Sequence, residues 1–248
     1  MVAIKRLIQF IFIYLLGITI LWIVKYSFHL SDYLIPSPVE LWHEAITNGF
    51  IYIKAVIDTQ TVAIEGHFLA IILATVVALI GRLRSWIGSF TKIAAYNLQA
   101  YPIVAVAPII FLFLGDGLAS RLLITTLICY FPLLLSFIGI FAEPVVEVEH
   151  FFKSTHRLNW RLELLIRTYE NLDKLITVII GSGTLAMVGT IIAEFLAATH
   201  GIGYAIRKAL YESNLAKILV CLFLIGLSSS LYLALLEGAG EFLKKHLS

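Results

Sequence analysis

The stretch ITVIIGSGTLAMVGTIIA occupies residues 176–193 and contains no charged side chain. A helix needs about 20 consecutive apolar residues to cross the ~30 Å hydrocarbon core of a bilayer. Length and composition therefore predict a membrane-spanning helix here. Three other uncharged runs have a similar length, at residues 7–24, 122–142 and 218–236.

The composition of the whole chain agrees with this prediction. Of its 248 residues, 60% are hydrophobic and 14% are charged, against roughly 45–50% and about 25% in soluble proteins. The net charge of +2 gives no reason to expect a nucleic-acid partner. We predict an all-α integral membrane protein with one transmembrane domain, a six-helix bundle over residues 1–248. Its spans are expected near 7–24, 62–80, 93–114, 122–142, 176–198 and 218–236.

Lysine and arginine are unevenly distributed over the connections between these spans. If both termini lie in the cytoplasm, most of the 18 Lys and Arg residues fall on the cytoplasmic side, as the positive-inside rule requires. The polar connection at residues 143–175 is then cytosolic, and residues 31–50 and 199–217 face outward. Pro36 and Pro38 predict an extended start to the first outward segment, followed by an amphipathic helix over residues 39–46.

The connection at residues 143–175 is the largest polar segment of the chain. Leu158, Leu162 and Leu165 recur at helical spacing, and charged side chains fill many of the remaining positions. This pattern is typical of short amphipathic helices at the edge of a membrane. The segment is either a solvated connector with an interfacial helix or a docking element for a cytosolic partner. Trp160 and the arginines are residue types that anchor interfaces.

Four other segments occur along the chain in the same order as similar segments of a known protein family. They are LIPSP at residues 34–38, QAYPIVAVAPIIFLFLGDG at 99–117, FPLLLSFIGI at 131–140 and VGTIIAEFLAATHGIGYAI at 188–206. From about Leu34 to the last span, the chain resembles the inner-membrane permease subunits of bacterial ABC importers. Within the binding-protein-dependent transport family, it is most similar to the nitrate/sulfonate/taurine branch.

The resemblance implies a type I importer permease for a small solute, which is nitrate-, sulfonate- or taurine-like or a vitamin precursor. It also implies a second permease subunit, a cytosolic ABC ATPase and a periplasmic or lipid-anchored substrate-binding protein at the bacterial inner membrane. ATP and Mg would be held by the ATPase, because this sequence has no G-x-x-x-x-G-K-[ST] loop, and no cofactor is expected on this chain. No Arg or Lys lies inside the predicted spans, so solute specificity is expected to reside in the binding protein.

In this family the polar connection is the coupling loop that docks on the ATPase. The loop departs from the family signature, with His150 where glutamate is usual and His156 where glycine is usual. That departure favours a second, non-identical permease, although a homodimer stays open. The resemblance assigns the coupling role to Ser154, Thr155, His156, Arg157, Leu158, Asn159 and Trp160.

The third and fifth spans are expected to line the translocation pathway. Prolines in the third span free backbone carbonyls that must be satisfied inside protein or by water. Small residues in the fifth span allow close approach of helices, either within the subunit or at a subunit interface. Together with the resemblance, these features assign the pathway and gate to Asn97, Gln99, Tyr101, Pro102, Gly183, Met187 and Glu194.

An intramembrane enzyme is the alternative function. Glu65, His67 and Glu194 are ionisable groups within or next to predicted spans, where such groups are costly and are functional candidates. An enzyme would need two or three of them to converge on one spot. If the second span begins at Gly66, Glu65 and His67 are interfacial instead, which is the interpretation we favour.

Overall fold

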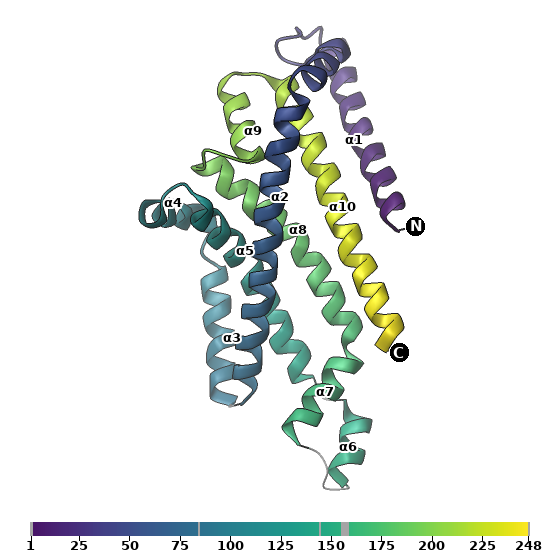
Figure 1. Ribbon diagram of the computed structural model, residues 1–248, viewed down its shortest axis with the longest axis vertical. Helices are drawn as coiled ribbons and strands as arrows, with labels where there is room; N and C mark the ends of the chain where they lie inside the picture. The colour runs from purple at the N-terminus through teal and green to yellow at the C-terminus, as the bar shows by residue number, and fades with distance from the viewer. Residues whose placement is uncertain (1, 84, 144, 155–158, 248) are drawn as a thin grey trace.

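The computed structural model describes residues 2–83, 85–143, 145–154 and 159–247, and all regular elements in these ranges are helices. The all-α prediction is therefore confirmed for this part of the chain (Figure 1). The helices are α1 Val2–Ser27, α2 Pro38–Leu83, α3 Ser85–Gln99, α4 Ile103–Leu114, α5 Leu118–Ala142, α6 Val146–Ser154, α7 Trp160–Glu170, α8 Leu172–Leu196, α9 Ile202–Tyr211 and α10 Leu215–Leu247.

Within the described residues, five helices are long and apolar enough to cross a membrane, namely α1, α2, α5, α8 and α10. A sixth span results only if α3 and α4 are counted together, and these two helices are bent by 92° at the break between them. Residues 93–114 therefore do not form one straight helix, and their role as a single span stays a prediction. Pro102 is the physical reason for the break, because it disfavours helical backbone at the preceding Tyr101 and has no N–H to donate.

The outward helix expected over residues 39–46 and the second span form one continuous helix, α2, with 46 residues. Its start is a capping box. The N–H of Ser37 donates to Glu40 Oε2 at 2.9 Å, and the N–H of Glu40 donates to Ser37 Oγ at 3.3 Å. At 1.5 Å per residue, α2 is roughly 69 Å long, so it extends well beyond a bilayer's hydrocarbon core.

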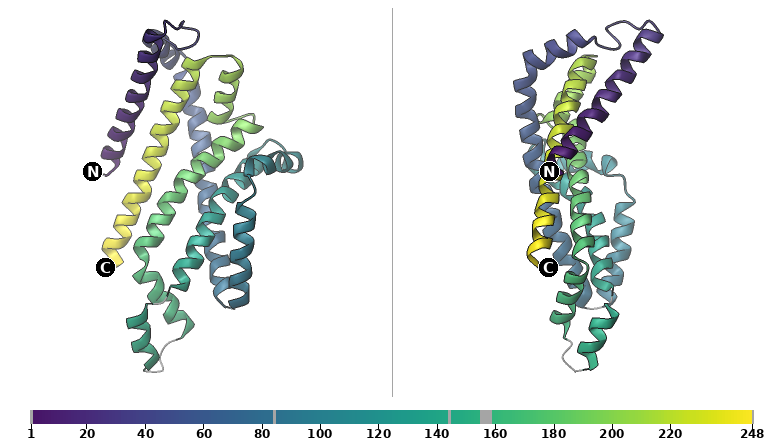
Figure 2. Two further views of the ribbon diagram at one scale, coloured as in Figure 1. Left: turned by 180° about the vertical axis from the view of Figure 1, so that it is seen from behind. Right: turned by 90° about the vertical axis from the view of Figure 1, so that its right-hand side faces the viewer.

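The core lies where α2, α5, α8 and α10 pack side by side (Figures 1 and 2). α2 contributes small side chains, and Ala63, Ala70 and Ala74 are completely buried. Gly66 allows α2 to approach α5 closely, since a Cβ at this position would lie 2.6 Å from Thr125 Cγ2. Close helix contacts through small residues are the usual packing mode in membranes.

α9 and the segment with α6 and α7 lie at opposite ends of the bundle (Figure 1). We call these the α9 end and the α7 end. α1 lies along α10 at the edge of the bundle and directs its first residues toward the α7 end, where α10 also finishes (Figures 1 and 2). The start of α1 and the end of α10 therefore point to the same end of the bundle.

The predicted polar connection at residues 143–175 contains two short helices, α6 and α7, and the first turn of α8. Asn159 caps α7, because its side-chain oxygen accepts the N–H of Leu162 at 2.9 Å. Asn and related residues stabilise a helix start in this way. Asn171 alone separates α7 from α8, so α7 continues directly into a membrane-spanning helix.

Candidate functional site

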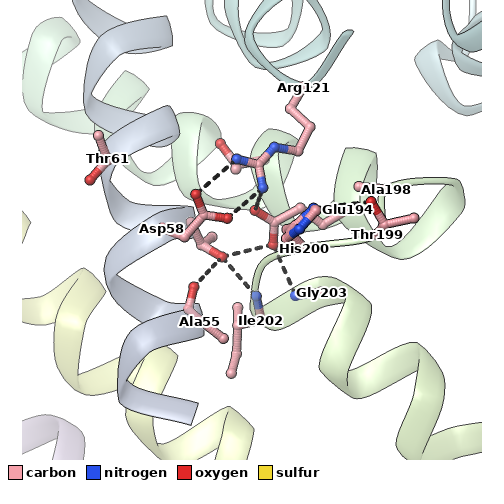
Figure 3. Close-up of polar contacts among 12 residues, drawn as sticks. Ala55, Asp58, Thr61, Arg121, Glu194, Ala198, Thr199, His200, Ile202 and Gly203 are labelled. Carbon is pink, nitrogen blue, oxygen red and sulfur yellow. Dashed lines mark hydrogen bonds and ion pairs between the residues drawn. The ribbon is translucent and has the colours of Figure 1, made fainter. Parts of the chain in front are cut away.

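A buried ion network joins three helices at the α9 end (Figure 3). Arg121, in the first turn of α5, binds Asp58 of α2 through two bonds, Nη1–Oδ2 at 2.6 Å and Nη2–Oδ1 at 3.1 Å. Its Nη1 also lies 3.4 Å from Oε1 of Glu194 in α8. The Arg121 and Glu194 side chains are 6% and 0% exposed, whereas that of Asp58 is 43% exposed.

The second oxygen of Glu194 holds the start of α9. The N–H of Gly203 donates to Glu194 Oε2 at 2.9 Å, and the Thr59 hydroxyl lies 2.7 Å from the same oxygen. Thr59 Oγ1 in turn accepts the N–H of Ile202 at 2.8 Å. The carboxylate thus lies at the positive end of the α9 dipole and accepts the N–H of Gly203, while Thr59 accepts that of Ile202; neither N–H has a partner within α9.

Two glycines make this arrangement possible. Gly201 has φ +89°, a conformation that side chains disfavour, and any Cβ there would overlap the Glu194 carboxylate. Gly203 lies against the backbone of α8, where a Cβ would be 2.5 Å from the carbonyl oxygen of Ile191. The turn between α8 and α9 is therefore shaped around Glu194.

Arg121 corrects the expectation that no cationic side chain lies within a span. α5 begins at Leu118, so Arg121 belongs to the candidate span Leu118–Ala142. Its charge is directed at Asp58 and Glu194, and its Nε is buried without a partner among the described residues. Both Nη atoms are paired with carboxylates, so removing a partner would leave an uncompensated buried charge at the junction of α2, α5 and α8.

His67 is completely buried in the protein and lies in the interior of α2. Its depth in the membrane stays a prediction. Its Nδ1 is 2.6 Å from the Tyr232 hydroxyl and its Nε2 is 2.7 Å from Ser182 Oγ. Because Ser182 donates to the carbonyl of Ile179, the assignment that satisfies every group has Nε2–H donating to Ser182 and Nδ1 accepting from Tyr232.

Replacing His67 with leucine is expected to lower the free energy of unfolding by about 1–3 kcal/mol, because Tyr232 and Ser182 would each lose a partner inside the bundle. The measurement is thermal unfolding of the purified chain in detergent. His246→Leu, at an exposed position near the end of α10, is the matched control and should leave the midpoint unchanged. Equal midpoints for the two variants would show that the His67 bonds contribute nothing.

The three groups of the alternative enzyme do not converge. Glu65 is exposed on α2, His67 binds Tyr232 and Ser182, and Glu194 binds the α9 start and Arg121. No partner is shared among these three sets of bonds. The geometry of the described chain therefore does not assemble the cluster that an intramembrane enzyme would require.

The predicted pathway residues fall into two groups. The four around the α3–α4 break are all exposed: Asn97, Gln99, Tyr101 and Pro102. Gly183, Met187 and Glu194 are buried. A Cβ on Gly183 would meet Leu236 and Leu233 of α10, so Gly183 serves packing within the chain. The open face of α8 is instead formed by Thr177, Gly181, Thr184 and Val188. The pathway roles stay predictions.

The coupling residues are only partly described. Thr155, His156, Arg157 and Leu158 lie outside the described residues. Ser154, at the end of α6, donates to the carbonyl of His150 at 2.8 Å. Trp160 begins α7 and is 55% exposed, with the Arg161 guanidinium 5.4 Å from its ring centroid. Their coupling role stays a prediction.

Sequence reasoning singled out Glu194 but missed the three residues that hold it, Asp58, Thr59 and Arg121. A weak signal was available, because Arg121 directly precedes the uncharged run at residues 122–142. A charge at the edge of an apolar run often has a partner within the protein. The identity of that partner was not visible, since Asp58 is 63 positions away in the sequence.

Comparison with known proteins provides the family context. No protein-family profile matches the chain. Formylaminopyrimidine transport permease protein ThiX of Halalkalibacterium halodurans is 22% identical over 220 residues, covering 87% of this chain and 86% of ThiX. Riboflavin transport system permease protein RibX of Chloroflexus aurantiacus is 32% identical over 143 residues, covering 56% of this chain and 53% of RibX.

A third relative is a probable ABC transporter permease protein of Haemophilus influenzae, 24% identical over 181 residues, covering 71% of this chain and 72% of the relative. The homologues of this chain are ABC transporter permeases. Together with the long apolar helices, they support a multi-pass membrane permease. Neither the solute nor the branch of the family follows from these matches alone.

Proposed function

We propose that this chain is the membrane-spanning permease subunit of an ATP-driven importer. The observation that carries the proposal is the match over most of the chain to an ABC transporter permease, combined with the two polar helices at one end of an apolar bundle. α6 and α7 would contact a cytosolic ATPase, which would hold ATP and Mg. Ser154, Asn159 and Trp160 are the described residues proposed for that contact, with residues 155–158 between them.

The transported solute is proposed to be small and delivered by a substrate-binding protein. Two relatives are named for formylaminopyrimidine and riboflavin, and both names denote nitrogen heteroaromatic compounds. We therefore favour the vitamin-precursor class over nitrate, sulfonate or taurine. The α9 end would face the binding protein, because α6 and α7 occupy the other end of the bundle.

The proposed location is the bacterial inner membrane, with both termini in the cytoplasm. The excess of Lys and Arg in the connections at the α7 end supports this orientation. A second permease subunit would complete the pathway, either another copy of this chain or a different one. The open face of α8 is a candidate for that contact, since helices in membranes associate through small residues.

Affinity purification of the tagged chain in mild detergent tests the proposal directly. We expect a nucleotide-binding ATPase to co-purify in fixed stoichiometry, together with one or two kinds of permease. Identification and quantification of every co-purifying protein by mass spectrometry provides the measurement. A chain that purifies alone, even after crosslinking in its native membrane, would contradict the proposed function.

A further inference from the structure

A closed ring of polar contacts joins three helices at the α7 end. Oε1 of Glu163 in α7 lies 2.6 Å from Nη2 of Arg82, near the end of α2, and 2.5 Å from Nη2 of Arg167 in α7. Both arginines then donate to the same carbonyl oxygen, that of Phe141 near the end of α5, with Arg167 Nη1 at 2.9 Å. We call Arg82, Phe141, Glu163 and Arg167 the inner ring.

The two arginines of the inner ring are suited to bind the C-terminal end of α5. The last carbonyls of α5 have no N–H partner within the helix and carry its negative dipole end, where cations are favourable. Arg167 also donates to the carbonyl of Ala142 at 3.1 Å. The side chains of Arg82, Glu163 and Arg167 are only 18%, 25% and 10% exposed, so water screens these charge-assisted bonds less than bonds on an open surface.

The ring determines which membrane helices α7 holds. Among the described elements, α6 packs only against α7, and the backbone of α7 packs against α5 and α8 but not against α2. Arg82 therefore provides the polar link between α7 and α2. α8 is connected to α7 through the chain itself and α5 packs against α7, whereas α2 is joined to α7 by the Arg82–Glu163 ion pair of the ring.

The same two helices are also bonded to each other at the other end of α5. Asp58 in the middle part of α2 and Arg121 in the first turn of α5 form the bidentate pair of the network at the α9 end. A separation of 24 positions from Asp58 to Arg82 corresponds to about 36 Å of helix. α5 is therefore bonded to α2 at both of its ends, with close packing between the two helices, so a displacement at one end is transmitted along this pair.

We infer that the inner ring transmits movement of α6 and α7 to the α2–α5 pair, with Arg82, Glu163 and Arg167 as positioning residues. This inference rests on the proposed function, because the movement would come from an ATPase bound at α6 and α7. According to this inference, the movement reaches α2 and α5, which do not adjoin α7 in the sequence. Without the ring, α5 and α8 would still contact α7, but α2 would lose its ion pair with it.

Hydrogen–deuterium exchange of the complete permease–ATPase complex tests this inference, with and without trapping by ATP, Mg and vanadate. In the native complex, trapping is expected to change exchange in α6 and α7 and also in α2 and α5. In Glu163→Gln, the change in α6 and α7 should persist, while the change in α2 and α5 should be largely lost.

Two further variants keep the test specific. Arg82→Lys retains the charge but loses the planar fork that serves both Glu163 and Phe141, so it should behave like Glu163→Gln with little loss of folding. Glu143→Gln removes an exposed ion pair with Lys174 at the same end, whose side chains are 54% and 53% exposed, and it should respond like the native complex.

The outcomes separate the inference from the proposed function. If the native complex contains an ATPase but α2 and α5 do not respond to trapping, the inference is wrong and the proposed function stands. A full response of α2 and α5 in both ring variants also overturns the inference. Loss of the ATPase from these variants overturns it as well, because the ring would then be needed for binding the ATPase. If no ATPase binds the native chain, both fail.

Discussion

Replacing Arg121 by methionine is expected to lower the free energy of unfolding by about 3–5 kcal/mol, because it leaves Glu194 and Asp58 without their cation. In a chain of this size, such a loss corresponds to a fall in the melting temperature on the order of 10 °C. The Glu194 side chain is 0% exposed, so water cannot replace the guanidinium. Thermal unfolding in detergent, followed by size-exclusion chromatography, provides the measurement.

Lys174→Met is the matched control for this experiment. It also breaks an ion pair, with Glu143, but both side chains are about half exposed, and exposed pairs contribute only about 0–1 kcal/mol. Adding Asp58→Asn and Glu194→Gln to Arg121→Met should recover most of the lost stability, since a fully neutral network leaves no unpaired buried charge. If Arg121→Met and Lys174→Met had the same small effect, the network would not hold the α9 end together.

Replacing Gly203 by alanine is expected to destabilise the α9 end by about 1–3 kcal/mol, the usual cost of overpacking. The added Cβ would lie 2.5 Å from the backbone oxygen of Ile191 and 2.7 Å from Glu194 Cβ. A backbone atom cannot rotate away, so α9 must move and its N–H bond to Glu194 must lengthen. Faster hydrogen exchange in α9 and a lower melting temperature would be the observed effects.

The expected loss of stability in Gly203→Ala is opposite to the usual effect of replacing glycine by alanine in a helix. Glycine within a helix normally costs about 0.5–1 kcal/mol relative to alanine, so a substitution without a steric conflict stabilises. Gly181→Ala in α8 is the control, because no atom lies within 4 Å of the Cβ position, and it should be neutral or stabilising. A stabilising effect of Gly203→Ala would show that α9 does not pack against α8 as described.

Much of the architecture could be predicted because it depends on local properties. Uncharged runs such as residues 176–193 and 122–142 identify their helices through length and hydrophobicity alone, and α8 and α5 contain both. The break within the third predicted span has an equally local reason. Residues 93–114 are sufficiently apolar, but Pro102 interrupts the helix, and the direction of α4 after the break depends on its packing against α5 and α8.

The candidate site could be predicted only in part. Glu194 was singled out because a carboxylate near an apolar run requires a partner, but the sequence does not say which partner. Asp58 and Arg121 were not singled out, and His67 was interpreted as an interfacial side chain. In the folded chain, each has its partners on other helices, which no local pattern reveals.

By itself, then, the sequence determined that this chain is an all-α membrane protein with a polar helical segment between two apolar helices, since hydropathy and helix length are properties of neighbouring residues. Only the tertiary structure decided that Arg121 joins Asp58 and Glu194 at one end and that Arg82 joins Glu163 at the other. The physical reason is that a buried charge demands a partner without specifying its position in the sequence, and only the packing of helices brings those partners together.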